Sequence, residues 1–133
     1  MNASGVRLFG FAAVIAVLLA GAAMLPMVAS SVGSDEPREV RLVARGMAYY
    51  LPGEAEANPT LRLRAGEEIR LVLRNEDGGM NHDFSVTPWK VGTALIEGKG
   101  ETSIVFRVPD SRGSTTYACT PHSIMMRGTI VVE

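Results

Sequence analysis

The sequence has few of the residues that would reveal a function directly, and each scarcity excludes something. Its only cysteine, Cys119, cannot form a disulfide within the chain. The 13 basic and 14 acidic side chains nearly cancel, so we predict no basic surface for nucleic acid. Paired carboxylates, a Ser/His/Asp set and a glycine-rich phosphate loop are all missing. We therefore predict neither an enzyme nor a nucleic-acid partner.

Helical periodicity is also missing, since no segment after residue 40 keeps it for more than about two turns. Apolar and polar residues alternate instead, most clearly over residues 61–64 and 69–74. Turn formers separate such runs roughly every 8–12 residues, which is typical of an all-β sandwich. We predict about seven or eight strands with Greek-key connections in one domain, residues 39–133, and we expect a monomer.

The N-terminal segment has a long apolar run, because the 22 residues 8–29 carry no charge and follow Arg7. A bilayer span needs about 20 apolar residues. The small residues near the end of the run also suit a cleavage site. The sequence thus leaves open whether residues 1–30 are a retained anchor or a cleaved signal, and we favour the anchor because of its length. Both alternatives predict a hydrophobic N-terminal helix, a linker over residues 31–38, and a periplasmic or cell-surface domain.

The lone cysteine begins the stretch CTPHSIMM, which lies between two strand-like runs. An odd cysteine in an exported protein is a free thiol, an intermolecular link or a metal ligand. The spacing favours metal, because His122 and Met126 follow Cys119 within eight residues. The only other histidine, His82, also lies beside a strand-like run. One thiolate, two imidazoles and one thioether are the donors of a blue-copper site, a trigonal Cys/His/His plane with a weak axial Met.

Two parts of the sequence resemble the cupredoxins, the small type I blue-copper proteins. YACTPH at residues 117–122 and MRG at residues 126–128 are similar to the ligand loop of amicyanin and plastocyanin. NHDF at residues 81–84 is similar to the segment that carries the first histidine ligand. The resemblance is weaker over residues 40–75 and does not reach residues 1–37. It implies one copper ion, cycling between Cu(I) and Cu(II), with equatorial ligands His82, Cys119 and His122 and axial ligand Met126.

The ligand loop departs from the family in its length. Three residues separate His122 from Met126, whereas amicyanin-type loops have one fewer and plastocyanin-type loops one more. Met125 would restore the amicyanin spacing and is the alternative axial ligand, but Met126 keeps the Met-x-Gly match. We prefer Met126 because Gly128 sets the exit from the loop. Met80, next to the first histidine segment, is a further possible thioether donor.

The residue after the first histidine also departs from the family, because Asp83 stands where many cupredoxins have asparagine. We expect Asp83 to accept a hydrogen bond from Thr120 and so to tie the two ligand loops together. Asn81, Asp83 and Thr120 form the predicted outer layer of contacts that orients the ligands. A charged Asp83 near copper would favour Cu(II) and lower the reduction potential.

A site with four protein donors leaves little room for substrate, which favours one-electron transfer over catalysis. We expect a small patch around His122 to receive other extracytoplasmic redox proteins in transient encounters; it comprises Pro121, Ser123, Ile124 and Met125. An uncleaved N-terminal segment would add the membrane as a partner. The main alternative is a module that stores or delivers copper to an extracytoplasmic oxidase without carrying electrons. Two others remain: a Cys119–His122 nucleophile–base pair, and a metal-free adhesion module.

Overall fold

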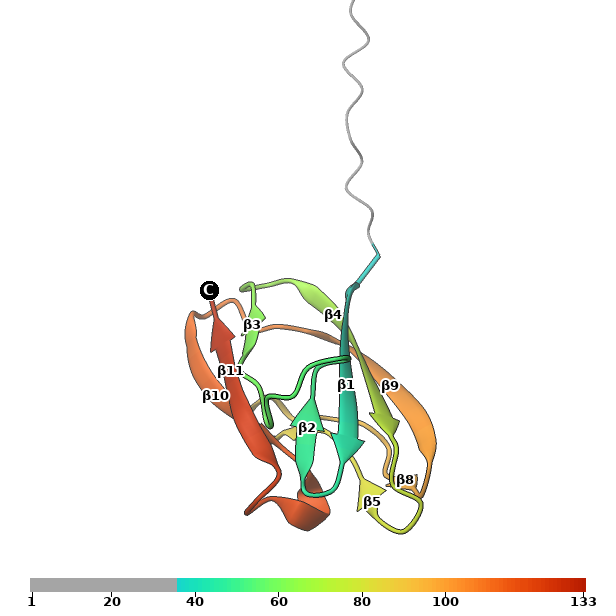
Figure 1. The fold of residues 1–133 in the computed structure, drawn as a ribbon. Helices are drawn as coiled ribbons and strands as arrows, with labels where there is room; N and C mark the ends of the chain where they lie inside the picture. Colours follow the sequence, from blue (N-terminus) through green and yellow to red (C-terminus); the bar gives the residue numbers. More distant parts are fainter. Residues whose placement is uncertain (1–35) are drawn as a thin grey trace, which may run out of the picture. The chain divides into compact units, whose positions relative to one another are not determined.

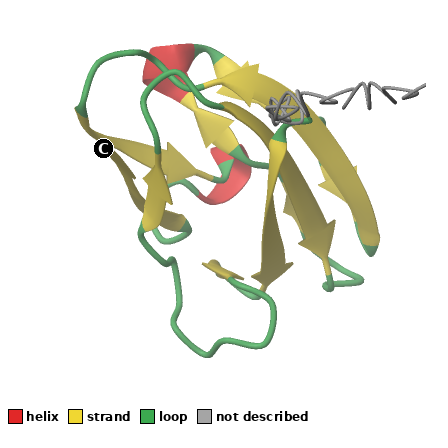
Figure 2. Cartoon of the chain, turned by 90° about the horizontal axis from the view of Figure 1, so that it is seen from above, coloured by secondary structure: helices red, strands yellow, loops and turns green. Residues whose placement is uncertain are grey.

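A computed structural model describes residues 36–133, whose strands form two β-sheets and one further pair (Figure 1, Figure 2). The first sheet has the strand order β2 (Ala48–Tyr50), β1 (Arg38–Arg45), β4 (Glu68–Asn75), β9 (Gly100–Arg107). The second has the order β3 (Leu61–Leu63), β11 (Arg127–Val132), β10 (Gly113–Ala118), β6 (Ser85–Val86), β7 (Val91–Gly92). A separate pair joins β5 (Asn81–His82) to β8 (Ile96–Glu97). The two 3₁₀ helices are single turns, η1 (Thr87–Trp89) and η2 (Thr120–His122).

Both sheets mix parallel and antiparallel pairs, because the chain passes repeatedly from one sheet to the other. In the first sheet β1 runs parallel to β4 and antiparallel to β2. In the second sheet β11 runs parallel to β3 and antiparallel to β10. The predicted β-sandwich is confirmed.

The core follows from the alternation seen in the sequence. In β4 the apolar residues Ile69, Leu71 and Leu73 are buried, while Arg74 is exposed. Successive side chains of a strand point to opposite faces, so this pattern places one face of β4 in the interior. Burying each such side chain contributes about 1.5–3 kcal/mol.

Three buried aromatic residues form a cluster in this core. Tyr117 stacks on Phe84 with ring centroids 5.4 Å apart, and Tyr49 lies 5.3 Å from Tyr117. Both phenols are hydrogen-bonded, since Tyr117 donates to the carbonyl of Pro59 at 2.6 Å and Tyr49 donates to that of Asp83. Burial is the main reason why the pKa of each phenol is raised. The cluster therefore holds β10 against the segment that follows β5.

Among the described residues the strand count exceeds the seven or eight expected, because four of the eleven strands have only two residues. The strand-like run beside His82 is not continuous, since β5 ends at His82 and β6 begins at Ser85. At the break, Phe84 forms two hydrogen bonds with Thr93 instead of bonds within a strand. The N–H of Thr93 donates to the carbonyl of Phe84 at 2.9 Å, and the N–H of Phe84 donates to the hydroxyl of Thr93 at 3.0 Å. One of these two bonds uses a side-chain hydroxyl, so the alternation of apolar and polar residues does not predict the break.

The predicted N-terminal helix, at residues 1–30, lies outside the described residues, as does most of the predicted linker. β1 begins at Arg38, the last residue assigned to that linker. Within residues 36–133 no helix has the length and apolar character needed to cross a membrane.

Candidate metal centre

The loop between β10 and β11 carries three of the four predicted metal ligands, Cys119, His122 and Met126. Cys119 follows β10 in an extended conformation, with φ −86° and ψ 123°, and η2 begins at the next residue. The N–H of His122 donates to the carbonyl of Cys119 at 3.1 Å. The N–H of Met126 donates to the carbonyl of His122, and the N–H of Cys119 to the carbonyl of Met126, both at 2.9 Å. These bonds close the loop on itself and define where its side chains point.

The fourth predicted ligand comes from a different part of the fold. His82 is the last residue of β5, which pairs with Ile96 of β8. Its side chain is fully buried, and β5 packs against η2. In Figure 1, β5, β8 and the loop after β10 lie at the end of the sandwich opposite the C-terminus.

The structure brings the thiol and both imidazoles to one point. Cys119 Sγ lies 3.7 Å from His82 Nδ1 and 3.6 Å from His122 Nδ1, and one donor atom from each residue lies within 4.8 Å of the others. The two imidazole rings have centroids 5.1 Å apart, with an angle of 58° between them. Cys119 and His82 are buried, and His122 is partly exposed.

These spacings agree with a single bound metal ion. Bonds of about 2.3 Å to sulfur and about 2.05 Å to nitrogen place the two atoms about 3.6–3.8 Å apart for angles of about 110–120° at the metal. The observed separations of 3.6 and 3.7 Å fall in this range. One sulfur and two imidazole donors, with a thioether nearby in sequence, are the set that blue-copper sites use. The residues present therefore fit a copper ion.

Burial raises the pKa of the Cys119 thiol. Backbone hydrogen bonds from Asp83 and His122 oppose this effect, and the Asp83 charge adds to it. Because metal ligation requires the thiolate, ion binding at this sulfur releases a proton.

The three methionines considered from the sequence differ in burial. Met126 is fully buried in the hydrophobic core, whereas Met125 is 64% exposed. Met80 is half-buried in the loop before β5, and its carbonyl accepts a hydrogen bond from Asn75 at 2.8 Å. Of the two adjacent methionines, only Met126 therefore turns its side chain into the protein.

The predicted outer contacts are found in part. Asp83 Oδ1 accepts a hydrogen bond of 2.6 Å from the backbone N–H of Thr120, so Asp83 ties the segment after β5 to η2 as expected. Asn81 is exposed on β5, where neighbouring side chains point to opposite faces. The structure thus brings Asp83 and Thr120 to the ligand loops, while the side chain of Asn81 points away from that of His82.

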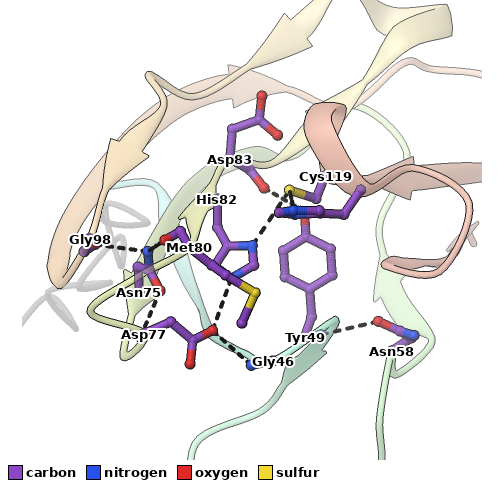
Figure 3. A network of polar contacts seen from close by, with 11 residues as sticks. Gly46, Tyr49, Asn58, Asn75, Asp77, Met80, His82, Asp83, Gly98 and Cys119 are labelled. Carbon is purple, nitrogen blue, oxygen red and sulfur yellow. Dashed lines mark hydrogen bonds and ion pairs between the residues drawn. The ribbon is translucent and has the colours of Figure 1, made fainter.

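Asp77 is a contact of the site that our sequence analysis missed. Its Oδ2 lies 3.0 Å from Nε2 of His82 and accepts a 2.7 Å hydrogen bond from the backbone N–H of Gly46 (Figure 3). In the sequence Asp77 is one acidic residue in a loop of turn formers, and only its position five residues before His82 hints at a role. Gly46 belongs to a distant turn, so the pattern carries no signal for this contact.

Gly128, which we expected to set the exit from the ligand loop, packs closely against Tyr117. It pairs with Tyr117 across β10 and β11, and no left-handed φ is found there. A Cβ at this position would lie 2.5 Å from Cζ and 2.6 Å from Cε1 of Tyr117. Glycine is therefore needed because the phenol ring crosses the backbone closely, and the ring thereby sets the exit from the ligand loop.

Comparison with known proteins agrees with this site. Residues 59–133, more than half of the chain, match the family described as copper-binding proteins of the plastocyanin/azurin type. The chain therefore belongs to the plastocyanin/azurin family of copper-binding proteins, and the predictions of a cupredoxin and of copper as its cofactor are confirmed. The cluster of His82, Cys119 and His122, with the buried Met126, fits a type I copper site.

Solved structures show the same fold at low sequence identity. Auracyanin A, a "blue" copper protein from Chloroflexus aurantiacus, is 15% identical with a TM-score of 0.57, over 74% of this chain and 100% of that chain. Reduced auracyanin from Roseiflexus castenholzii is 14% identical with a TM-score of 0.59, over 72% and 97%. Reduced rusticyanin is 22% identical with a TM-score of 0.52, over 77% and 87%. No curated protein matches the sequence significantly. At these identities the likeness concerns the fold, and function is argued from the site.

Proposed function

We propose that this protein carries single electrons between redox partners through a type I copper site. His82, Cys119 and His122 would hold the ion as its equatorial ligands. The observation that carries the proposal is that donor atoms from two separate segments converge. Cys119 Sγ lies 3.6 Å from Nδ1 of His122 and 3.7 Å from Nδ1 of His82. Copper bound there would supply a one-electron couple between Cu(I) and Cu(II).

We assign the axial position to Met126. Its side chain is fully buried at the end of the ligand loop, and its backbone bonds to both Cys119 and His122. Met125 is 64% exposed and lines the surface around His122. A buried thioether is held by its packing, so Met126 would help to hold the ion through a weak bond without opening a position for substrate. The same enclosure supports a carrier over an enzyme.

His122 is the ligand nearest to solvent, and we propose that electrons pass through it. We propose that the partner patch comprises Pro121, Ser123, Ile124 and Met125, which lie around His122 together with Met47. These residues line a surface hollow of about 260 Å³, and Ile124 is 89% exposed. Small apolar patches suit transient redox encounters, which bury little surface.

The setting of this activity remains part of the proposal. The uncharged run of residues 8–29 supports export, so we place the domain outside the cytoplasm as a monomer that meets other exported redox proteins. A retained anchor would raise the effective concentration of partners at the membrane.

Copper titration tests the assignment. Adding Cu(II) to the purified apoprotein should produce an intense visible thiolate-to-copper band that saturates at one equivalent. Cys119→Ser should bind without that band, because the thiolate is missing. A colourless wild-type product would contradict the proposal. Reversible voltammetry with fast self-exchange would support electron transfer, whereas rapid loss of copper to chelators would favour the delivery alternative.

A further inference from the structure

We propose that Asp77 is a positioning residue for His82. Asp77 selects the tautomer of the buried imidazole and lowers the reduction potential of the site. The inference rests on the proposed function, because it concerns the same copper ligand. It adds a carboxylate that neither the ligand spacing nor the family match identifies.

The contact lies on the side of the imidazole away from the thiol. His82 turns Nδ1 toward Cys119 Sγ, at 3.7 Å, and Nε2 toward Asp77 Oδ2, at 3.0 Å. A carboxylate accepts hydrogen bonds, so Nε2 carries the proton and its N–H donates a hydrogen bond to Asp77. Nδ1 is then left with its lone pair directed at the space that it shares with the thiol and His122. This is the tautomer that a metal ligand needs at Nδ1.

Asp77 can enforce that choice because it is itself held on both sides. Its N–H donates to Asn75 Oδ1 at 2.9 Å, and its Oδ2 accepts from the N–H of Gly46 at 2.7 Å. Asn75 is 2% exposed, and its side chain donates to the carbonyls of Met80 and Gly98, both at 2.8 Å. Figure 3 shows these contacts as one connected set that leads from Asn75 to the imidazole. The loop before β5 is thus fixed to the turn after β1.

The carboxylate also acts through its charge. It lies behind a fully buried imidazole, so little water separates it from the metal position, although 19% of its own side chain is exposed. A negative charge there favours the more positive Cu(II) over Cu(I). Asp77 thereby lowers the reduction potential.

Two substitutions separate positioning from charge. Oδ2 alone contacts both His82 and Gly46, so in Asp77→Asn one amide oxygen can keep both hydrogen bonds while the charge is lost. Asp77→Ala removes the acceptor as well. Asp110→Asn is the matched control, because Asp110 is an exposed carboxylate that pairs with Arg107 at 3.7 Å, beside the turn of Gly66. Thermal unfolding of each full-length apoprotein checks that the variants fold.

The first measurement needs no metal. ¹⁵N-edited NMR of the apoprotein should show His82 as the single Nε2–H tautomer in wild type and Asp77→Asn, and as a mixture in Asp77→Ala. Copper affinity, measured by chelator competition, should fall about 10–100-fold in Asp77→Ala, as for lost outer contacts of other metal ligands. In Asp77→Asn the ratio of Cu(II) to Cu(I) affinity should fall about tenfold, which is a rise of about 59 mV in potential. Asp110→Asn should match wild type in all three readouts.

Either of two results would overturn the inference. One is a single, unchanged His82 tautomer with unchanged copper affinity in Asp77→Ala. The other is a potential in Asp77→Asn equal to that of Asp110→Asn. A wild-type protein that binds no copper would refute the proposed function instead, and the tautomer spectra would still decide the positioning role of Asp77.

Discussion

Replacing Gly128 by alanine tests whether the exit from the ligand loop depends on close packing with Tyr117. The added Cβ would lie 2.5 and 2.6 Å from two ring carbons, well inside van der Waals contact. The ring of Tyr117 cannot simply move aside. Its centroid lies 5.4 Å from that of Phe84 and 5.3 Å from that of Tyr49, and its hydroxyl donates to the carbonyl of Pro59 at 2.6 Å. One methyl group must therefore displace a buried aromatic cluster.

The expected loss follows from two terms. Overpacking a well-filled core costs about 1–3 kcal/mol. Breaking the buried Tyr117–Pro59 hydrogen bond adds about 1 kcal/mol. Gly128→Ala should thus lower the free energy of unfolding by about 2–4 kcal/mol, and the Tm by at least about 8 °C in a domain of this size. Urea denaturation of the apoprotein, followed by circular dichroism, measures the change.

Gly79→Ala is the matched control, since Gly79 is exposed and a Cβ there meets no atom within 4 Å. It should be neutral or slightly stabilising, because alanine restricts the unfolded chain. Tyr117→Phe should partly rescue Gly128→Ala, because the ring without its hydroxyl is free to shift, and a double-mutant cycle measures this coupling. Equal stability of Gly128→Ala and Gly79→Ala would refute the packing argument.

Two further predictions concern the methionines and an ion pair. Met126→Leu should alter the visible band and raise the reduction potential of the copper-loaded protein, whereas Met125→Leu should leave both unchanged; the opposite result would assign the axial bond to Met125. Glu67→Gln should lower the free energy of unfolding at pH 7 by about 0.5–1 kcal/mol, because the bidentate bond from the partly exposed Arg38 is lost. The Arg38 hydrogen bond lowers the pKa of Glu67, so its stabilisation is present above the ordinary glutamate pKa of about 4.3 and disappears as the pH falls through the lower folded value. A pH-independent difference between the two proteins would contradict this reasoning.

Much of the fold could be predicted because strand patterns are local. The alternation over residues 61–64 and 69–74 corresponds to β3 and β4, since burial on one face of a strand imposes a period of two residues. The strands β7 and β8 lack that signal, because two residues are too few to show a period of two. The hydrogen bond from Phe84 to Thr93 was hidden because its acceptor is a side-chain hydroxyl, which the alternation does not reveal.

The sequence by itself determined the donors, because Cys119, His122 and Met126 lie within one short loop and His82 is the only other histidine. Tertiary structure decided what depends on distant partners. It buried Met126 while leaving Met125 in solvent, placed Asp77 behind His82, and laid Tyr117 across Gly128. Local spacing can specify which atoms converge within a loop. Burial, and contacts between residues of different segments, exist only once the two sheets have packed.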